Sequence, residues 1–216
     1  MAGSTIVYRS TVGAGNRQKW TLSLWVKWDV ETGSSYNRIY DAGGDTDYFR
    51  FNETDGSITW YSGTYGFTTT SLHRDPTAWM HLVLRVDTTA ASALAAGDRY
   101  RFYINGVEDN TFSWENNPTE AYEGATNNTG IDMVFGGAST SDQNLMGCLC
   151  HINMCDGESY APTEFGESES DSAMWKIKPS PSVTYGTNGF FLKMEDRTNL
   201  DLDSGTNTFT FTTSGS

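Results

Sequence analysis

The sequence predicts an all-β protein folded as a two-sheet antiparallel jelly-roll sandwich. Apolar and polar side chains alternate along several short runs, as they do in strands with one buried face. Glycine, asparagine and aspartate separate these runs and supply the turns. Helical periodicity is nearly absent, and many short strands joined by turns are typical of sandwiches and jelly rolls.

The longest strands are expected in the first half of the chain. Residues 20–28 place five apolar side chains on one face: Trp20, Leu22, Leu24, Val26 and Trp28. Residues 79–86 do the same with Met80, Leu82, Leu84 and Val86. Shorter strands are expected at 39–40, 48–51 and 57–61, between turns rich in glycine and aspartate.

A β-hairpin is expected at Asn105-Gly106. Residues 99–104 alternate as a strand does, and Val107 begins the returning strand. Both central positions of a tight two-residue turn need positive φ, which asparagine and glycine adopt readily.

The second half of the chain adds further strands, expected at 132–135, 145–154 and 189–194. Residues 162–166 have the proline and glycine of a single helical turn. A last strand is expected at 208–213, where Phe209 and Phe211 share one side.

Composition narrows the class of protein. The chain has 216 residues, with 27 acidic and 14 basic side chains and a net charge of −13. This excess of negative charge argues against binding nucleic acid through its phosphates. Aromatic residues form 13% of the chain, which excludes a disordered protein, and no apolar run is long enough to span a membrane. We expect one domain, 1–216, with long polar loops at about 109–130 and 157–181.

The three cysteines lie within one short segment, so they do not predict a disulfide framework. The side chains of Cys148 and Cys150 would project from the same face of a strand, which is poor geometry for a tetrahedral zinc site with Cys155. We expect small buried side chains at these positions, with zinc as the alternative.

Three of these strands resemble a known family. The stretches Trp20–Lys27, Thr77–Thr88 and Arg101–Val107 are similar to the concanavalin A-like lectin/glucanase superfamily, and most similar to its laminin G-like branch. The resemblance implies a concanavalin A-like jelly roll in which the C-terminal strand returns beside the N-terminal one. Residues 4–9 and 208–213 are the candidates for that pair.

A second series of segments resembles lectin-like structural proteins of tailed bacteriophages, especially marine phages. It consists of Leu145–Gly147, Ile152–Gly157, Pro162–Gly166, Trp175–Pro179 and Tyr185–Lys193. This resemblance implies a protein on the virion surface, assembled in the cytoplasm of the bacterial host and bound to other capsid or fibre proteins. We also expect a homo-oligomer, because cyclic association would multiply weak docking or glycan contacts. Capsid decoration is the expected role. The alternatives are a tail-fibre or receptor-binding lectin, a free carbohydrate-binding module and, last, a glycan hydrolase.

Glycan hydrolases of the superfamily carry two glutamates and an aspartate on one strand, roughly as Glu-x-Asp-x-x-Glu. The nearest segment here surrounds Asp132, but Gly130 and Phe135 stand where the glutamates should be. A retaining hydrolase needs two carboxyl groups about 5 Å apart. We therefore expect a protein that is not an enzyme.

Two aromatic segments are candidates for a carbohydrate site, because sugars stack on aromatic rings and accept hydrogen bonds from amides. The first surrounds a glycine turn and contains Trp60, Tyr61 and Tyr65. The second lies in the first long polar loop and contains Trp114, Asn116, Asn117 and Tyr122. Packing is the alternative for both segments. It is also what we expect of the five other tryptophans, Trp20, Trp25, Trp28, Trp79 and Trp175.

No cofactor is expected to be required, but the laminin G-like resemblance implies a calcium site at the rim of the sandwich. Asp41, Asp45 and Asp47 offer three carboxylates in one glycine-containing loop, the kind of oxygen ligand that calcium prefers. Aspartates that simply form the turn are the alternative.

Overall fold

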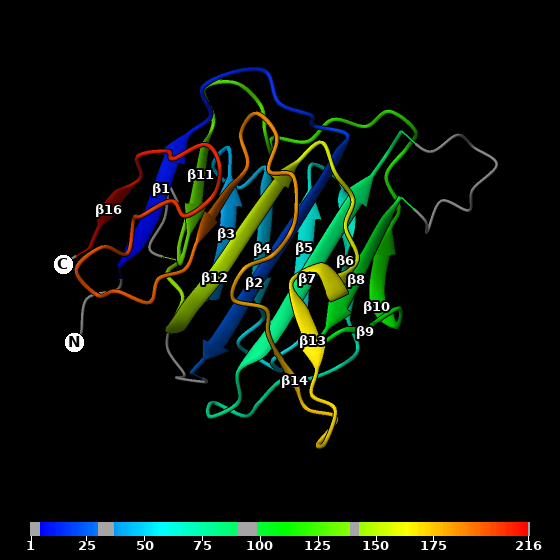
Figure 1. Ribbon diagram of the computed structural model, residues 1–216. Coiled ribbons are helices and arrows are strands. Elements are labelled where there is room, and N and C mark those ends of the chain that lie inside the picture. The colour runs from blue at the N-terminus through cyan, green and yellow to red at the C-terminus, as the bar shows by residue number, and fades with distance from the viewer. Residues whose placement is uncertain (1–4, 30–36, 90–98, 139–142, 216) are drawn as a thin grey trace.

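Two large antiparallel sheets face each other in the computed structural model, which describes residues 5–29, 37–89, 99–138 and 143–215 (Figure 1). Sheet A contains, in spatial order, β10 (Phe112–Asn116), β6 (Tyr65–Thr69), β5 (Ile58–Ser62), β4 (Asp47–Phe51), β3 (Asn37–Ala42), β11 (Asp132–Phe135), β1 (Ile6–Ser10) and β16 (Thr212–Ser214). Sheet B contains β15 (Phe190–Leu192), β12 (Gly147–Asp156), β2 (Lys19–Trp28), β7 (Met80–Asp87), β8 (Tyr100–Ile104) and β9 (Val107–Glu108). This architecture confirms the predicted jelly-roll sandwich.

The predicted strands are present, with shifts of a few residues at their ends. The hairpin between β8 and β9 turns at Asn105 and Gly106, which have φ values of 49° and 80°. The strand expected at 145–154 is β12, which begins and ends two residues later. The helical turn expected at 162–166 is a 3-10 helix, η2 (Pro162–Glu164). Among the described residues no helix is long and apolar enough to cross a membrane.

The main core lies between the sheets and is rich in aromatic rings. Trp20 of sheet B meets Trp60 of sheet A edge to face, with ring centroids 6.4 Å apart. Trp28 stacks on Phe51 at 4.5 Å. The alternating face predicted for residues 20–28 is the inner face of β2, and all five of its apolar side chains are buried. Trp79 departs from the expectation of packing, since 41% of its surface is exposed just before β7.

The two ends of the chain meet at one edge of sheet A, as the resemblance implied (Figure 1). Strand β16 pairs with β1, and Ile6 lies opposite Ser214. Residue 4 of the predicted pair lies outside the described residues. Only the last part of 208–213 pairs with β1, because Phe211 instead turns into the core against Phe190.

A third layer covers the outer face of sheet B. The segment predicted as a long polar loop at 157–181 contains η2 and a small sheet of β13 (Gly166–Ser168) and β14 (Trp175–Ile177), which Figure 1 shows in front of sheet B. A second apolar cluster lies beneath this layer: Val83, Cys155, Phe165, Tyr185 and Phe191. The loop interpretation was therefore incomplete, because the acidic run at 167–171 is mostly exposed, whereas Phe165 before it is buried and Trp175 after it packs against His81. Of the three cysteines, Cys155 is buried as expected, whereas Cys148 is exposed.

His81 joins the third layer to sheet B. The Trp175 indole donates a hydrogen bond from Nε1 to Nδ1 of His81 at 2.8 Å. Because Nδ1 is an acceptor, the neutral ring carries its proton on Nε2, which lies 2.8 Å from the Ser23 hydroxyl. Trp25 stacks on the imidazole with ring centroids 5.0 Å apart. Burial, aided by the nearby His151, lowers the pKa of His81 to about 3.

This depressed pKa predicts that acid destabilises the protein through His81. The unfolded chain takes up a proton below pH 6.5, whereas the folded chain resists it until about pH 3, so stability is lost as the pH falls through that window. The expected loss from His81 is roughly 1.4 kcal/mol for each pH unit. Denaturant unfolding between pH 7 and pH 5 should show a shallower pH dependence for His81→Phe than for the wild type. Equal slopes in the two proteins would contradict the assignment.

Candidate functional site

The two aromatic segments predicted to bind sugar meet on the outer face of sheet A. Tyr61 of β5 stacks on Trp114 of β10, with centroids 6.2 Å apart. Tyr48 of β4 stacks on the other side of Tyr61 at 5.1 Å. We call Tyr48, Tyr61 and Trp114 the aromatic row. Trp114 lies on the edge strand and is 40% exposed, so it offers apolar ring surface to a ligand.

Tyr65, Tyr122 and Asn116 lie at the end of the same β5–β6 hairpin. The rings of Tyr65 and Tyr122 meet edge to face at 4.6 Å. The Asn116 amide donates to the carbonyl of Thr64 in the hairpin turn at 2.7 Å. Asn117 instead donates to the Glu115 carboxylate. The structure therefore brings together most of the residues from two segments that are far apart in the sequence.

Trp60 does not belong to this group. It is 2% exposed and packs against Trp20, Phe67 and Tyr100 inside the sandwich. Successive side chains of a strand point to opposite faces, so Tyr61 lies outside because Trp60 lies inside. The expectation that Trp60 offers a stacking face to sugar is therefore corrected to a core role.

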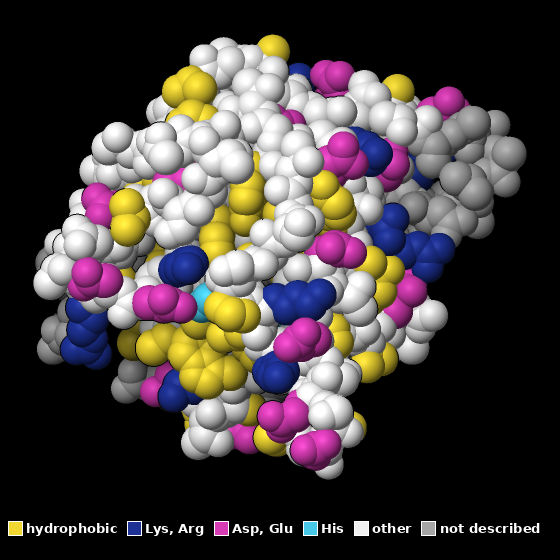
Figure 2. All heavy atoms as spheres, in the orientation of Figure 1, with side chains coloured by type: hydrophobic (Ala, Val, Ile, Leu, Met, Phe, Trp, Pro, Cys, Tyr) yellow, Lys and Arg dark blue, Asp and Glu magenta, His cyan; other side chains and the backbone are white. Residues whose placement is uncertain are grey.

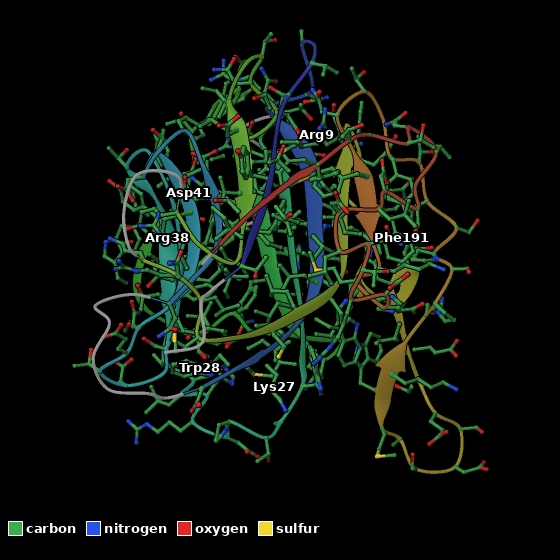
Figure 3. The ribbon with its side chains drawn as sticks, turned by 90° about the vertical axis from the view of Figure 1, so that its left-hand side faces the viewer. Arg9, Lys27, Trp28, Arg38, Asp41 and Phe191 are labelled. Carbon is green, nitrogen blue, oxygen red and sulfur yellow. The ribbon has the colours of Figure 1, made fainter. Side chains whose placement is uncertain are left out.

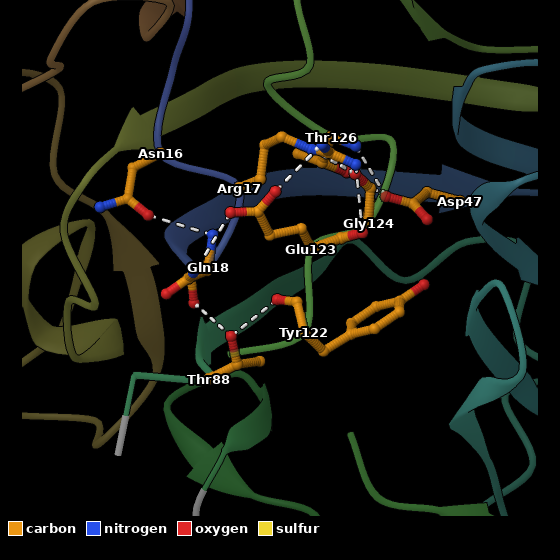
Figure 4. Close-up of polar contacts among 9 residues, drawn as sticks. All are labelled: Asn16, Arg17, Gln18, Asp47, Thr88, Tyr122, Glu123, Gly124 and Thr126. Carbon is orange, nitrogen blue, oxygen red and sulfur yellow. Dashed lines mark hydrogen bonds and ion pairs between the residues drawn. The ribbon is translucent and has the colours of Figure 1, made fainter. Parts of the chain in front are cut away.

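A polar network holds the loop that carries Tyr122 (Figure 4). Arg17 donates from Nε to the carbonyl of Gly124 at 2.8 Å and forms an ion pair with Glu123 at 3.1 Å. Gln18 donates to the same carboxylate, and the Thr88 hydroxyl donates to the carbonyl of Tyr122 at 2.8 Å. Residues from the start of β2 and the end of β7 thus fix the loop beside the hairpin.

The three aspartates predicted as calcium ligands divide between two sets of partners, one for Asp41 and Asp45 and another for Asp47. Arg38 donates to Asp41 at 2.8 Å and to Asp45 at 2.6 Å, so a guanidinium already neutralises these carboxylates. Figure 3 shows Arg38 and Asp41 together on sheet A. Asp47 instead accepts hydrogen bonds from Ser62 at 2.6 Å and from the backbone of Thr126 at 2.7 Å.

The calcium hypothesis does not fit this arrangement. Within the described ranges no three acidic, histidine or cysteine side chains are grouped as metal ligands would be. Burial raises the pKa of Asp47, which opposes the ionised form that a cation would need. The aspartates fit the alternative, in which they fix the turn between β3 and β4.

Two arrangements bear on catalysis. Asp132 on β11 accepts a hydrogen bond from the Ser10 hydroxyl, and its strand neighbours supply no glutamate. The Ser23–His81 pair has the wrong polarity for a nucleophile and its base, because Nε2 of His81 carries the proton and donates it to Ser23.

The sequence interpretation missed Tyr48 as a member of the aromatic row. Its position opposite Tyr61 depends on the pairing of β4 with β5, which the sequence does not state. The sequence did contain a signal for this position. In a strand that buries Phe49 and Phe51 on one face, Tyr48 points to the opposite, outer face.

A protein-family model described as the concanavalin A-like lectin/glucanases superfamily matches residues 3–158. No curated protein matches the sequence. Among solved structures, the heptameric SAP-like pentraxin from Limulus polyphemus aligns with a TM-score of 0.52 and 11% identity over 74% of this chain and 72% of that one.

Two other solved structures align less well. Tailspike protein 2 of bacteriophage CBA120 gives a TM-score of 0.48 and 12% identity, covering 85% of this chain but 28% of the tailspike domain. Domain 4 of an extracellular arabinanase from Geobacillus stearothermophilus gives 0.45 and 17% identity, over 68% of this chain and 65% of that domain. At these identities the likeness concerns the fold alone.

The Arg38–Asp41 pair predicts a large stability effect. Both side chains are almost fully buried, so Arg38→Met removes the cation that faces a buried carboxylate. The expected loss is about 3–5 kcal/mol in the free energy of unfolding, measured in denaturant. Lys176→Met is the matched control, since the Lys176–Glu167 pair is about half exposed and should contribute less than about 1 kcal/mol. Similar losses in the two variants would contradict the assigned role of Arg38.

Proposed function

This chain belongs to the concanavalin A-like lectin/glucanase superfamily, and from that premise we propose that it binds carbohydrate at the aromatic row without catalysing a reaction. The observation that carries the proposal is the exposed ring of Trp114, backed by Tyr61 on the outer face of sheet A. Aromatic rings bind the C–H faces of sugars, and a ring held by a stacked neighbour loses little freedom on binding.

Polar groups beside the aromatic row orient the bound sugar in this proposal. Asn116 is exposed next to Trp114, and its amide is already positioned by Thr64. Tyr65 is partly exposed at the hairpin end, with its hydroxyl 3.3 Å from that of Thr119. A few fixed polar groups around an apolar surface are typical of sites that recognise a particular ligand.

The non-enzymatic part of the proposal is supported by chemistry rather than by the fold, which hydrolases share. Asp132 has no glutamate at the spacing that β-glucan hydrolysis needs. The Ser23–His81 pair is buried and has its proton on the serine side of the ring.

We also propose that the domain is displayed on a bacteriophage virion, as a capsid-surface lectin rather than a tail-fibre tip. The support is the resemblance of the segments between Leu145 and Lys193 to lectin-like structural proteins of tailed phages. In the structure these segments form β12, the third layer and β15. The resemblance therefore extends to the segments that cover the outer face of sheet B. Homo-oligomeric display would multiply weak glycan contacts.

Trp114→Ala should weaken glycan binding by at least about fivefold, because it removes the stacking surface without opening the core. A glycan array identifies a ligand, and calorimetry then compares its affinity for the wild type and the variant. Trp79→Ala is the matched control, since Trp79 is equally exposed but precedes β7 on the other sheet. Unchanged affinity in Trp114→Ala, or equal losses in both variants, would reject the aromatic row as the site.

The virion proposal predicts that the protein copurifies with mature particles in a fixed copy number. Quantitative mass spectrometry of gradient-purified phage measures that number, and immunogold labelling locates the protein. Labelling over the head supports the capsid role. Absence from particles would overturn the virion role, and labelling confined to fibre tips would overturn the capsid role.

A further inference from the structure

A groove of about 510 Å³ crosses the outer side of sheet B, away from the aromatic row. One wall is residues 180–185, the other is residues 204–206, and Phe191 and Lys193 lie between them. Figure 3 shows Phe191 on the side of the molecule opposite Arg38. All the lining residues follow the segment matched by the family model, which ends at residue 158.

Both walls are fastened to the sheet, so the groove is formed before any ligand arrives. In the first wall, Tyr185 accepts the backbone N–H of Asp156 of β12 at 2.8 Å and donates its hydroxyl to Asn153 of the same strand at 2.9 Å. On the other wall, Ser204 donates its N–H to the carbonyl of Phe191 at 2.7 Å. Asp203 lies behind that wall and accepts hydrogen bonds from the backbone of Phe191 and Gly205 at 3.0 and 2.8 Å. A preformed site does not spend binding energy on ordering its walls.

The lining combines hydroxyl groups with a single charge. Its hydroxyl-bearing side chains are Tyr160, Ser180, Ser182, Thr184, Tyr185, Ser204 and Thr206. The hydroxyls of its serines and threonines make no hydrogen bond with the described part of the protein, so they are available to a ligand. Lys193 is the one charged residue of the lining, and its ammonium lies 5.7 Å from the centroid of the Phe191 ring.

The charge of this lining is opposite to that of the whole protein. The chain has a net charge of −13, yet the described lining contains a lysine and no carboxylate. Figure 2 shows this face, where acidic side chains lie around the lining together with basic and hydrophobic ones, so the absence of carboxylates is a property of the groove lining and not of the whole face. Lys193 forms no ion pair within the described residues, so its charge can meet an anion. The best complement is a ligand with many hydroxyls and one or few negative groups.

We propose that this groove binds an acidic saccharide, a short segment of a glycan whose sugars carry carboxylate or sulfate groups. Lys193 binds the anionic group as a point charge, and the serine and threonine hydroxyls exchange hydrogen bonds with those of the sugar. The volume lies within the range of roughly 300–1,000 Å³ that is typical of small-ligand sites. The site is separate from the aromatic row, so the protein would hold glycans on two opposite faces.

Calorimetry with defined tetrasaccharides tests the proposal. The probes are a tetragalacturonate, its fully methyl-esterified form and a chondroitin sulfate tetrasaccharide of equal length. We expect at least one acidic probe to bind with an affinity that falls as salt is added, and the neutral ester to bind at least about tenfold more weakly. The acidic probe that binds more tightly identifies carboxylate or sulfate as the preferred group.

Variants locate the binding. Lys193→Gln should weaken binding of the acidic probe about tenfold or more, because it removes a charge-assisted contact. Thr206→Val should weaken it through loss of a hydroxyl on the opposite wall. Lys27→Gln is the matched control, since it removes the same charge from β2, outside the groove lining, and it should retain wild-type affinity. Circular dichroism establishes that each variant is folded.

The outcomes also separate this site from the aromatic row. Trp114→Ala should leave the affinity for the acidic probe unchanged, so loss of binding in that variant would place the ligand on the other face and overturn the proposal. Failure of both acidic probes to bind at about 1 mM, or equal binding of the neutral ester, would overturn it as well. Unaltered affinity in both Lys193→Gln and Thr206→Val would exclude the groove.

Discussion

The rest of the structure depends on the burial of both faces of sheet B. Strand β2 is buried along nearly its whole length, and its two least buried residues are lysines, Lys19 and Lys27. Sheet A covers the inner face, as in any sandwich. The outer face carries Val83, Trp25 and His81, and all three side chains are buried. The chain after β12 therefore has to fold back over sheet B, and this return creates the third layer.

Polar groups fix where the returning chain lies. Thr21 on the outer face of β2 donates its hydroxyl to the carbonyl of Glu158 and accepts the N–H of Tyr160, both at 2.8 Å. The His81–Trp175 bond fixes the next part of the layer. Buried polar groups that lack partners are costly, so these bonds favour one position over many sliding ones. The same principle acts on sheet A, where Asp47 and Arg38 hold the turns near the aromatic row.

Most of the fold could be predicted from the sequence, because strands with one buried face alternate visibly. The inner face of β2 and the hairpin at Asn105-Gly106 are of this kind. The third layer looked like a loop because its two strands have only three residues each and bury few side chains. Its apolar anchors, Phe165 and Trp175, are separated by the acidic run at 167–171.

The candidate site was harder to predict than the fold. The sequence identifies aromatic segments but does not say which of two adjacent rings faces outward, and this is why Trp60 and Tyr61 were grouped together. Three aspartates close in sequence suggested one metal site. In the structure Asp41 and Asp45 share the Arg38 guanidinium, whereas Asp47 accepts a hydrogen bond from Ser62. The Asp47–Ser62 contact depends on the pairing of β4 with β5, which the sequence does not show.

The pairing of the chain ends has a mechanical consequence. Ile6 lies opposite Ser214, and Tyr8 opposite Thr212, so the ends enter and leave the sheet at the same point. A force that pulls these ends apart acts along the hydrogen bonds between β1 and β16, which run perpendicular to the strands. The bonds then open one after another, as in a zip, instead of resisting together in shear. Under tension between its ends, the molecule would shed β16 while the rest of the sandwich stays intact.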